Sequence, residues 1–551
     1  MLMFIGILLS IISFLPPVNY EMSLAGNFGE PRAHHFHGGI DIKTERVENK
    51  PVFSVGSGYV SRVVIGKYGY GKAVYVKHPE GYTSMFCHLN AFCPKIENIV
   101  RERQRASKNY NVDIALAPYE CPVAKGQVIA ISGNTGSSTA PHIHMEMYES
   151  ESGDMVDPLM FFGKYIKDTT PPLAHGIMVY PQVGGGVFCG STRKQSFSLS
   201  ALNIAGKYTA WGKIGFGIWA NDYMDNTYNR LGVRKTQLIV DGRLVFESDV
   251  ARIPGRMTRV MDYCGDYEHF IKTGTWYMKS FVEPGNHLPI YNTDANKGYV
   301  VFDEERDYHI TYVLTDASGN NTKYNFTVEG KAERNPFAVS PPRHTNLFRR
   351  ILWDRLTCIS LPNVQLTVKP NSLTQDRIIS PTIYRQPEKL SDRYSFNSVS
   401  LPLVRYARIS IKCNKYVKDT SKLYISNSYG VSRYCGGIYK KGWLTGYIRD
   451  IGDTYEIKYD DKPPVIEPLK TGLGASSHYL RFSIYDDGSG LKQCYGYIDN
   501  RQLVLDGVSR KGVYTCDLRK YLNKNGTLHR LEVIAIDNKN NKETYTAHIK
   551  Y

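Results

Sequence analysis

The stretch Pro141-His142-Ile143-His144-Met145-Glu146 alternates polar and apolar side chains. On a β-strand, successive side chains point to opposite faces, so His142, His144 and Glu146 share one face. Such a polar face needs a partner: zinc with a water is one, and bulk solvent at an exposed face is the other. The stretch therefore predicts a strand of an antiparallel sheet beside a candidate metal site.

Short strand patterns bounded by turn residues surround this stretch. They cover residues 51–55, 58–64, 73–77, 82–87, 127–132 and 142–148. One helical pattern, rich in charge, covers 95–107 and continues as a polar stretch to Pro122. We expect an antiparallel sheet with one inserted helix, and the insertion is a candidate wall for a substrate groove.

The composition predicts a mainly β protein of several domains. A chain of 551 residues is too long for one hydrophobic core, so three or four domains are expected. Its 41 tyrosines favour strands over helices. With 42% hydrophobic and 22% charged residues, the chain has the composition of a globular protein and not of a disordered one.

Two parts of the chain repeat each other. The linkers Asp168-Thr169-Thr170-Pro171-Pro172 and Asp461-Lys462-Pro463-Pro464 are similar, and similar segments follow each of them. The matched segments, in the same order, are FGIWAND (216–222) with FSIYDD (482–487), LIVDGRL (238–244) with GYIDNRQL (496–503), and ITYVLTDASGNN (310–321) with LEVIAIDNKNN (531–541). Ordered matches of this kind indicate a duplicated unit.

Both copies consist of short alternating strands joined by Asp, Asn and Gly turns, which is typical of an antiparallel sandwich. We expect immunoglobulin-like β-sandwiches at 170–335 and 462–551, with a less regular β-rich domain at 337–460 between them. None of the three carries a pattern of catalytic residues. A spacing, docking or binding role is therefore expected for them.

The N-terminus and the net charge bear on location and partners. Residues 1–15 (MLMFIGILLSIISFL) form an apolar run that is too short to span a bilayer comfortably. This run resembles the core of an export signal, and a retained anchor is the alternative. We assign residues 1–20 to this signal or anchor. No other segment is long and apolar enough to cross a membrane. The net charge of +16 suits a nucleic acid, an anionic envelope polymer or an acidic membrane equally well, and a solvated basic surface without a specific partner is the default interpretation. Since no cluster of basic residues with interleaved aromatics occurs in the sequence, nucleic acid is not an expected partner.

The ten cysteines leave disulfide pairing open. In an exported protein disulfides would persist. Because no CxxC pair occurs, a structural zinc site of four cysteines is not expected.

Three further stretches supply polar groups to the first domain. His37 and Asp41 are separated by Gly-Gly-Ile, which permits a tight turn that brings an imidazole and a carboxylate to one ion. His88 ends a strand whose other residues are apolar or aromatic, a position at which a lone histidine is ordinarily a core or edge residue. The small residues 132–140 lead into the strand of His142, where they form either a turn or a place for a substrate backbone to approach.

In this order, these pieces resemble the M23 (LytM-like) zinc metallopeptidases. The family's opening motif is matched by Phe28-Gly29-Glu30-Pro31-Arg32, and its HxGxD motif by His37-Gly38-Gly39-Ile40-Asp41. Its strand ending in histidine is matched by Phe86-Cys87-His88-Leu89, and its last motif by 132–146. An M23 domain followed by immunoglobulin-like modules is also a family arrangement.

The resemblance implies a peptidase domain at 21–167 that binds one zinc ion per chain through His37, Asp41 and His144. An open position would remain for water, as in catalytic zinc sites. His142 and His88 would act on the scissile peptide, one as general base and the other on the oxyanion. Glu146 would orient a ligand histidine.

The implied activity is endopeptidase hydrolysis, by a metal-activated water, of the peptide cross-links of bacterial peptidoglycan. The implied location is the periplasm or cell envelope. Envelope proteins are candidate partners of the C-terminal sandwiches.

Small departures and two rival interpretations remain. The opening motif is one residue longer before Arg32, Ala140 replaces a glycine, and Cys87 raises the question of redox sensitivity, although a packed inert thiol is expected. One rival is a non-catalytic scaffold that binds or activates another wall hydrolase. The other is an envelope adhesion protein with structural zinc, which would need a fourth ligand from His34, His35 or Cys87.

Overall fold

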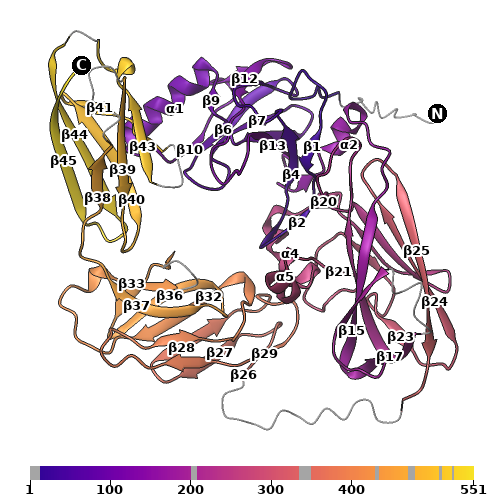
Figure 1. Cartoon of the computed structure of the whole chain (residues 1–551). Helices are drawn as coiled ribbons and strands as arrows, with labels where there is room; N and C mark the ends of the chain where they lie inside the picture. The colour runs from indigo at the N-terminus through magenta and orange to yellow at the C-terminus, as the bar shows by residue number, and fades with distance from the viewer. Residues whose placement is uncertain are drawn as a thin grey trace, which may run out of the picture.

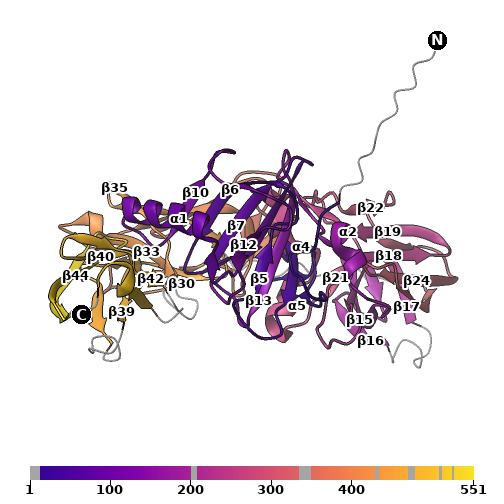
Figure 2. The same ribbon diagram turned by 90° about the horizontal axis from the view of Figure 1, so that it is seen from above.

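The computed structural model describes residues 13–199, 208–333, 349–427, 433–469, 478–507, 512–523 and 526–551. The protein is mainly β, as predicted, and four large hydrophobic cores follow one another along the chain. Figure 1 shows the four units arranged in a ring, with the last unit beside the helix of the first. Seen from its edge in Figure 2, the ring is thinner than it is wide.

An antiparallel sheet forms the centre of the first unit. Its strand order is β1 (Leu24–Gly26), β4 (Gly39–Lys43), β13 (His142–Glu149), β8 (Tyr82–Cys87), β7 (Lys72–Lys77), β6 (Gly58–Ile65), β10 (Val112–Ala115). A small sheet orders β5 (Pro51–Phe53), β12 (Val128–Ile131) and β9 (Ala91–Phe92), and the hairpin β2 (Pro31–Arg32), β3 (His35–Phe36) precedes β4. Each strand predicted from the sequence of this unit is present.

The predicted inserted helix is α1 (Pro94–Ser107). It begins with proline, whose fixed φ suits the first helical position, and ends at Lys108, which adopts the left-handed conformation with φ 51°. Ile96 and Val100 are its buried apolar residues. The chain then returns through β10 and β11 (Pro122–Val123), which both pair with β6, so the insertion also extends the sheet.

The packed core of the first unit begins before residue 21. Phe14 and Val18 are 2% and 3% exposed and belong to this core, although the predicted export segment or anchor covers 1–20. Residues 1–12 of that segment lie outside the described residues. Within the described ranges, no helix combines the length and apolar character that crossing a membrane requires. All ten cysteines are free.

The second unit follows α2 (Leu159–Phe162) and η1 (Gly163–Tyr165). Its sheet orders β16 (Gln195–Ser198), β15 (Leu173–Phe188), β17 (Tyr208–Asn221), β25 (Asn321–Gly330), β24 (Asp307–Thr315), β18 (Lys235–Val240), β19 (Arg243–Asp249), β22 (Tyr291–Thr293), with β21 (Met278–Lys279) and β23 (Val300–Phe302) on β17. The two layers of the predicted sandwich are continuous because the start of the long β17 pairs in parallel with β25.

Two features join the first and second units. Strand β20 (Arg252–Ile253) pairs with β14 (Met155–Val156), so a strand from the second unit extends the first sheet. The segment with η2 (Gly255–Val260), α4 (Met261–Cys264) and α5 (Tyr267–Thr273) then packs against the β2–β3 hairpin through a separate core that includes Phe28 and Phe36.

The third unit encloses its core between two five-stranded sheets. One orders β27 (Thr357–Leu361), β28 (Val364–Val368), β32 (Pro402–Lys412), β36 (Trp443–Asp450), β35 (Ile438–Lys440); the other orders β30 (Thr382–Tyr384), β31 (Arg393–Ser395), β37 (Thr454–Tyr459), β33 (Leu423–Asn427), β34 (Arg433–Tyr434). A short pair, β26 (Arg349–Ile351) with β29 (Arg377–Ile379), and η3 (Thr420–Lys422) complete it. This unit is more regular than the sequence predicted.

The fourth unit is a sandwich of two four-stranded antiparallel sheets, consistent with the predicted immunoglobulin-like fold. One orders β38 (Val465–Pro468), β39 (Tyr479–Tyr485), β43 (Val513–Asp517), β42 (Asp506–Gly507); the other orders β41 (Arg501–Leu503), β40 (Leu491–Ile498), β44 (Leu528–Asp537), β45 (Lys542–Lys550). A 3₁₀ turn, η5 (Leu518–Lys520), follows β43.

The fourth unit closes the ring by docking on α1. Arg101 donates from Nη1 to Asp506 Oδ1 over 2.6 Å, and the Gln502 side chain donates to the Arg105 carbonyl over 2.7 Å. The Gln493 side chain donates to the Lys108 carbonyl over 2.7 Å at the end of the helix. The inserted helix therefore carries a contact between the two ends of the chain, which its sequence did not predict.

Candidate metal centre

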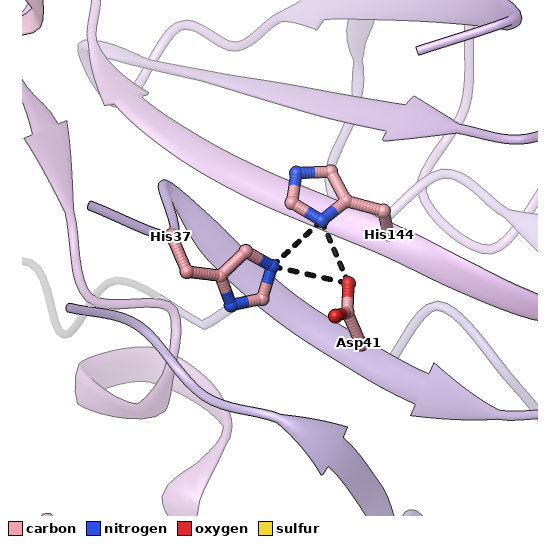
Figure 3. Close-up of side chains that lie close together, drawn as sticks. All are labelled: His37, Asp41 and His144. Carbon is pink, nitrogen blue, oxygen red and sulfur yellow. Dashed lines mark hydrogen bonds and ion pairs between the residues drawn. The ribbon is translucent and has the colours of Figure 1, made fainter. Parts of the chain in front are cut away.

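The register of two neighbouring strands builds the centre. Strands β4 and β13 are antiparallel and pair Asp41 directly with His144, so both side chains project from the same face of the sheet. His37 lies just before β4, after the β2–β3 hairpin, and its imidazole turns back over Asp41. Figure 3 shows the three side chains converging on one point.

The three donor atoms form a compact triangle. His37 Nε2 lies 3.1 Å from Asp41 Oδ1 and 2.9 Å from His144 Nδ1, and the latter lies 2.8 Å from Asp41 Oδ1. Ligands of a tetrahedral zinc ion at about 2.0–2.1 Å stand about 3.3 Å apart. Two imidazoles and one carboxylate at this spacing fit a zinc ion, and the set leaves a fourth position free of protein ligands, as catalytic zinc sites do.

Each of the three side chains is held by a second partner on its far side. His37 donates from Nδ1 to the Asn27 carbonyl over 2.6 Å. Asp41 accepts through Oδ2 from Arg32 Nη2 at 2.7 Å, and His144 contacts Glu146 Oε1 through Nε2 at 2.8 Å. These contacts fix the ring orientation and the nitrogen that each imidazole presents to the centre, as the outer partners of metal ligands do.

Glu146 is completely enclosed and satisfied. It is 1% exposed and accepts hydrogen bonds from Tyr70 Oη at 2.9 Å and from Tyr148 Oη. Burial opposes its charge, but the hydrogen bonds from His144 and the two tyrosines outweigh burial and lower the Glu146 pKa. Glu146 therefore stays ionised, which strengthens the ligand character of the imidazole it holds.

The two histidines of the centre differ in their protonation. Burial lowers the pKa of His37 to about 4, so His37 is neutral and donates only to Asn27. Burial also opposes charge on His144, but its hydrogen bonds to Asp41 and Glu146 raise its pKa to about 9. His144 thus carries a proton between two carboxylates, at the position where a metal ion would take the place of that proton.

His142 and His88 flank the centre without joining it. His142 donates from Nδ1 to the Ala140 carbonyl at 2.8 Å, and its Nε2 lies 3.4 Å from Asp41 Oδ1. His88 donates from Nδ1 to the Thr135 carbonyl at 2.8 Å, and the two rings lie 4.8 Å apart. Burial, followed by the neighbouring histidines, lowers the His88 pKa to about 4.

His88 sits in unusual backbone geometry. Its φ is 59°, a left-handed conformation that few residues other than glycine adopt. Its amide donates to the Tyr70 carbonyl at 3.0 Å. Strained backbone of this kind is concentrated at functional sites, where the surrounding structure holds it in place.

The structure therefore brings all the predicted site residues together: His37, Asp41, His144, His142, His88 and Glu146. It does not recruit the candidate fourth ligands, because the described residues form a group of three at this point. His34 instead pairs with Asp262 at 2.9 Å, and the His35 ring contacts the Ala33 carbonyl. Cys87 is buried, and burial raises its thiol pKa well above the usual range, which indicates an inert thiol.

Sequence reasoning missed the supporting residues. Arg32 belongs to the opening motif, and Tyr148 continues the alternating face of His144 and Glu146, so both carried a signal. Tyr70 and the Asn27 carbonyl carried none, since each reaches the site through tertiary structure alone. Behind Arg32, a cavity of about 430 Å³ extends between the hairpin and the second unit, with Trp276 and Phe270 on its wall.

Comparison with known proteins matches two family models to this chain. The model of peptidase family M23 matches residues 35–112, and a Zu5-like domain model matches 349–460. A metalloprotease from Haemophilus influenzae is 28% identical over 149 residues, which is 26% of this chain and 26% of that protein. The matched part thus spans about a quarter of the relative's length.

Solved structures also align with about a quarter of the chain. A zinc-containing peptidase from Vibrio cholerae is 25% identical, covers 26% of this chain and 39% of its own, and has a TM-score of 0.20. The catalytic domain of lysostaphin from Staphylococcus simulans is 23% identical, covers 26% and 93%, and has a TM-score of 0.20.

Proposed function

From the match of its first unit to peptidase family M23, we propose that this chain is a zinc-dependent endopeptidase that hydrolyses the peptide cross-links of bacterial peptidoglycan. One observation carries the proposal: three ligand atoms lie within 3.1 Å of one another, and two further histidines flank them. A metalloprotease relative supports the peptidase activity. The substrate is the finer part of the proposal.

His37, Asp41 and His144 would hold the zinc ion. When bound, zinc supplies a Lewis acid that polarises the scissile carbonyl and makes water a nucleophile near neutral pH. Arg32, Asn27 and Glu146 keep the three ligands in place before the ion arrives. These outer partners would therefore orient the three ligands toward the ion.

His142 and His88 would move the protons. Because each donates from Nδ1 to a backbone carbonyl, each neutral ring keeps an unprotonated Nε2. One ring can take the proton of the attacking water, and the other, when protonated, can donate to the oxyanion that forms on the peptide carbonyl. The acquired proton then passes to the leaving amine.

We also propose that the protein works in the periplasm or cell envelope. Its net charge of +16 favours contact with anionic wall polymers. The β-sandwiches would then position the peptidase unit on the wall or on envelope proteins.

Digestion of purified peptidoglycan by the zinc-loaded full chain tests the proposal, with products identified by mass spectrometry. The expected result is conversion of cross-linked dimers to monomers, lost in His142→Ala and after zinc removal. His548→Ala, which changes an exposed histidine on β45, is the matched control and should retain full activity. Intact muropeptides with fully zinc-loaded protein would instead favour a non-catalytic scaffold.

A further inference from the structure

Three aspartates meet where the first unit joins the second. Asp168 lies in the linker, Asp222 follows β17 and Asp316 follows β24, and one carboxylate oxygen of each lies within 4.8 Å of the others. Asp222 and Asp316 are each 3% exposed. Three carboxylates this close and this buried repel one another unless something positive lies between them.

The same triad recurs in the duplicated unit. One carboxylate oxygen from each of three other aspartates lies within 4.8 Å of the others, and these are Asp460, Asp486 and Asp537. The strand registers show that the positions correspond, because Leu173 pairs with the residue before Asp222, and Val465 pairs with the residue before Asp486. The cluster is therefore a property of the repeated unit and not an accident of one loop.

An asparagine braces each cluster in the same way. The Asn320 side chain donates to Asp316 Oδ2 at 2.8 Å and to the Asp168 carbonyl at 3.2 Å. The Asn541 side chain donates to Asp537 Oδ2 at 2.6 Å and to the Asp460 carbonyl at 3.0 Å. In both copies, the carbonyl of the first aspartate, Asp168 or Asp460, is thus tied to the loop that follows the third, Asp316 or Asp537.

The first cluster contains an oxygen with no partner. Oδ1 of Asp222 is buried and accepts no hydrogen bond from the described residues. Among those residues, no lysine, arginine or histidine forms an ion pair with Asp168, Asp222 or Asp316. A buried carboxylate oxygen without a hydrogen-bond donor is rare in folded proteins, because no interaction in the protein compensates the free energy of its desolvation.

A cavity lies beside the cluster. It has a volume of about 350 Å³ and is lined by Asp168 and Asp222 together with Asn27 and Leu24 of the first unit. Lys164 also lines it, but its ammonium lies 5.0 Å over the Tyr165 ring. The cavity is large enough for a hydrated ion and its remaining water ligands.

We propose that Asp168, Asp222 and Asp316 form a calcium site that joins the first and second units. Carboxylate oxygens are hard ligands, and calcium accepts six to eight oxygens in flexible geometry, whereas magnesium ordinarily keeps several waters and binds one or two carboxylates. The bound ion would fix the linker of Asp168 to the end of β17, and so hold the peptidase unit against the sandwich.

The charge of the three carboxylates agrees with this assignment. Burial, followed by the negative charges of Asp316 and Asp168, raises the Asp222 pKa to about 8. Burial likewise raises the pKa of Asp168 to about 6. These shifts record uncompensated negative charge, which a divalent cation would neutralise.

The second cluster is the natural comparison. Lys539 stands where the first copy has Ser318, two residues after the corresponding aspartate. Its ammonium donates to the Leu423 carbonyl at 2.7 Å, and Lys422 donates to the Lys539 carbonyl at 2.9 Å. Two ammonium groups beside the second cluster lower its attraction for a cation, so the first cluster is the stronger site.

Calcium titration of the full chain tests the site. Protein is stripped of metal ions on a chelating resin and then reloaded with one zinc ion per chain. It is titrated with Ca²⁺ by calorimetry and followed in parallel by thermal unfolding. We expect one strong site and a rise in melting temperature with Ca²⁺. Equal concentrations of Mg²⁺ should give a smaller rise, and an equal rise would overturn the choice of calcium.

Two variants make the test specific. Asp222→Asn should abolish the strong site. In calcium-free buffer at about pH 9, above the Asp222 pKa of about 8, the variant should unfold at a higher temperature than the natural protein, because one repelling charge is gone. Asp168→Asn, a milder change at a partly exposed position, should also abolish strong binding. Asp486→Asn is the matched control in the second copy and should leave strong calcium binding at the first cluster unchanged. Strong binding that persists in both Asp222→Asn and Asp168→Asn, or no binding to the natural protein, would overturn the proposal.

Discussion

The His37–Asp41–His144 centre and the Asp168–Asp222–Asp316 cluster each bring three polar side chains together, but their charges are balanced in different ways. In the first, Arg32 neutralises the outer oxygen of Asp41 and a proton on His144 lies between two carboxylates. In the second, backbone amides and Asn320 cover part of the oxygens, and Asp222 keeps one oxygen without a donor. Protein groups balance the charge of the first centre, whereas the proposed calcium ion would balance the charge of the second.

This difference has a functional meaning. A site that must open a coordination position to substrate has its ligands fixed by the protein, so that its geometry survives ligand exchange. At a site that joins two units, an ion that binds only the joined state stabilises the junction by its binding free energy. This stabilisation matters most where the carboxylates repel one another without the ion. Removal of zinc from the first centre should therefore abolish the peptidase activity. Removal of calcium from the second should weaken the contact between the first and second units.

The largest expected effect comes from removing a ligand of the first centre. His144→Ala should abolish stoichiometric zinc binding and lower peptidoglycan hydrolysis by about 10⁴-fold or more, on the scale of losing an entire catalytic group. Metal analysis and muropeptide mass spectrometry measure the two quantities. Calcium binding should be unchanged, and its loss would show that the two sites are not independent.

The next effect separates catalysis from metal binding. His142→Ala should lower the hydrolysis rate by about 10²–10⁴-fold, the usual contribution of a positioned acid or base, while zinc content stays at one per chain. Loss of zinc together with activity would make His142 a ligand and contradict the assignment. His548→Ala serves again as the matched control.

A smaller effect is expected at the partner of His144. Glu146→Gln keeps the shape but removes the charge, and should weaken zinc affinity by about 10–100-fold, as changes to outer partners of metal ligands do. Competition with a zinc chelator measures it. Tyr70→Phe, which removes only one of the hydrogen bonds that Glu146 accepts, should have a weaker effect, and the reverse order would contradict the role given to Glu146.

The two aspartate clusters can be made more alike by one change. Lys539→Ser reproduces the first copy and removes a positive charge, so it should strengthen calcium binding at the second cluster by about tenfold, equivalent to 1.4 kcal/mol. Calorimetry should then resolve a second strong site. An unchanged titration would mean that the lysine is not what distinguishes the clusters.

The smallest effect is expected at Cys87, which lies beside His88 in the sequence but is fully buried. Its buried thiol should not respond to mild oxidants, so the activity of the natural protein and of Cys87→Ala should stay about equal before and after peroxide treatment. Selective inactivation of the natural protein would restore the redox interpretation.

The sequence by itself determined the local structure of the first unit and the candidate ligands. Alternation over 142–146 is a property of neighbouring residues, so it correctly predicted β13 and the shared face of its polar side chains. The charged pattern at 95–107 likewise predicted α1 to within one residue. The repeated segments contained four of the six clustered aspartates, and Asp168 in the first linker was a fifth, so that only Asp460 lay outside the segments that the sequence singled out.

Only the tertiary structure decided which of these residues meet. The pairing of Asp41 with His144, the reach of Arg32 and Tyr70 to the centre, and the convergence of Asp168, Asp222 and Asp316 join residues far apart in the chain. The same holds for β20 in the first sheet and for Arg101 on Asp506. The periodicity of a segment specifies its conformation and its buried face, whereas strand register and domain contacts depend on the packing of the whole chain.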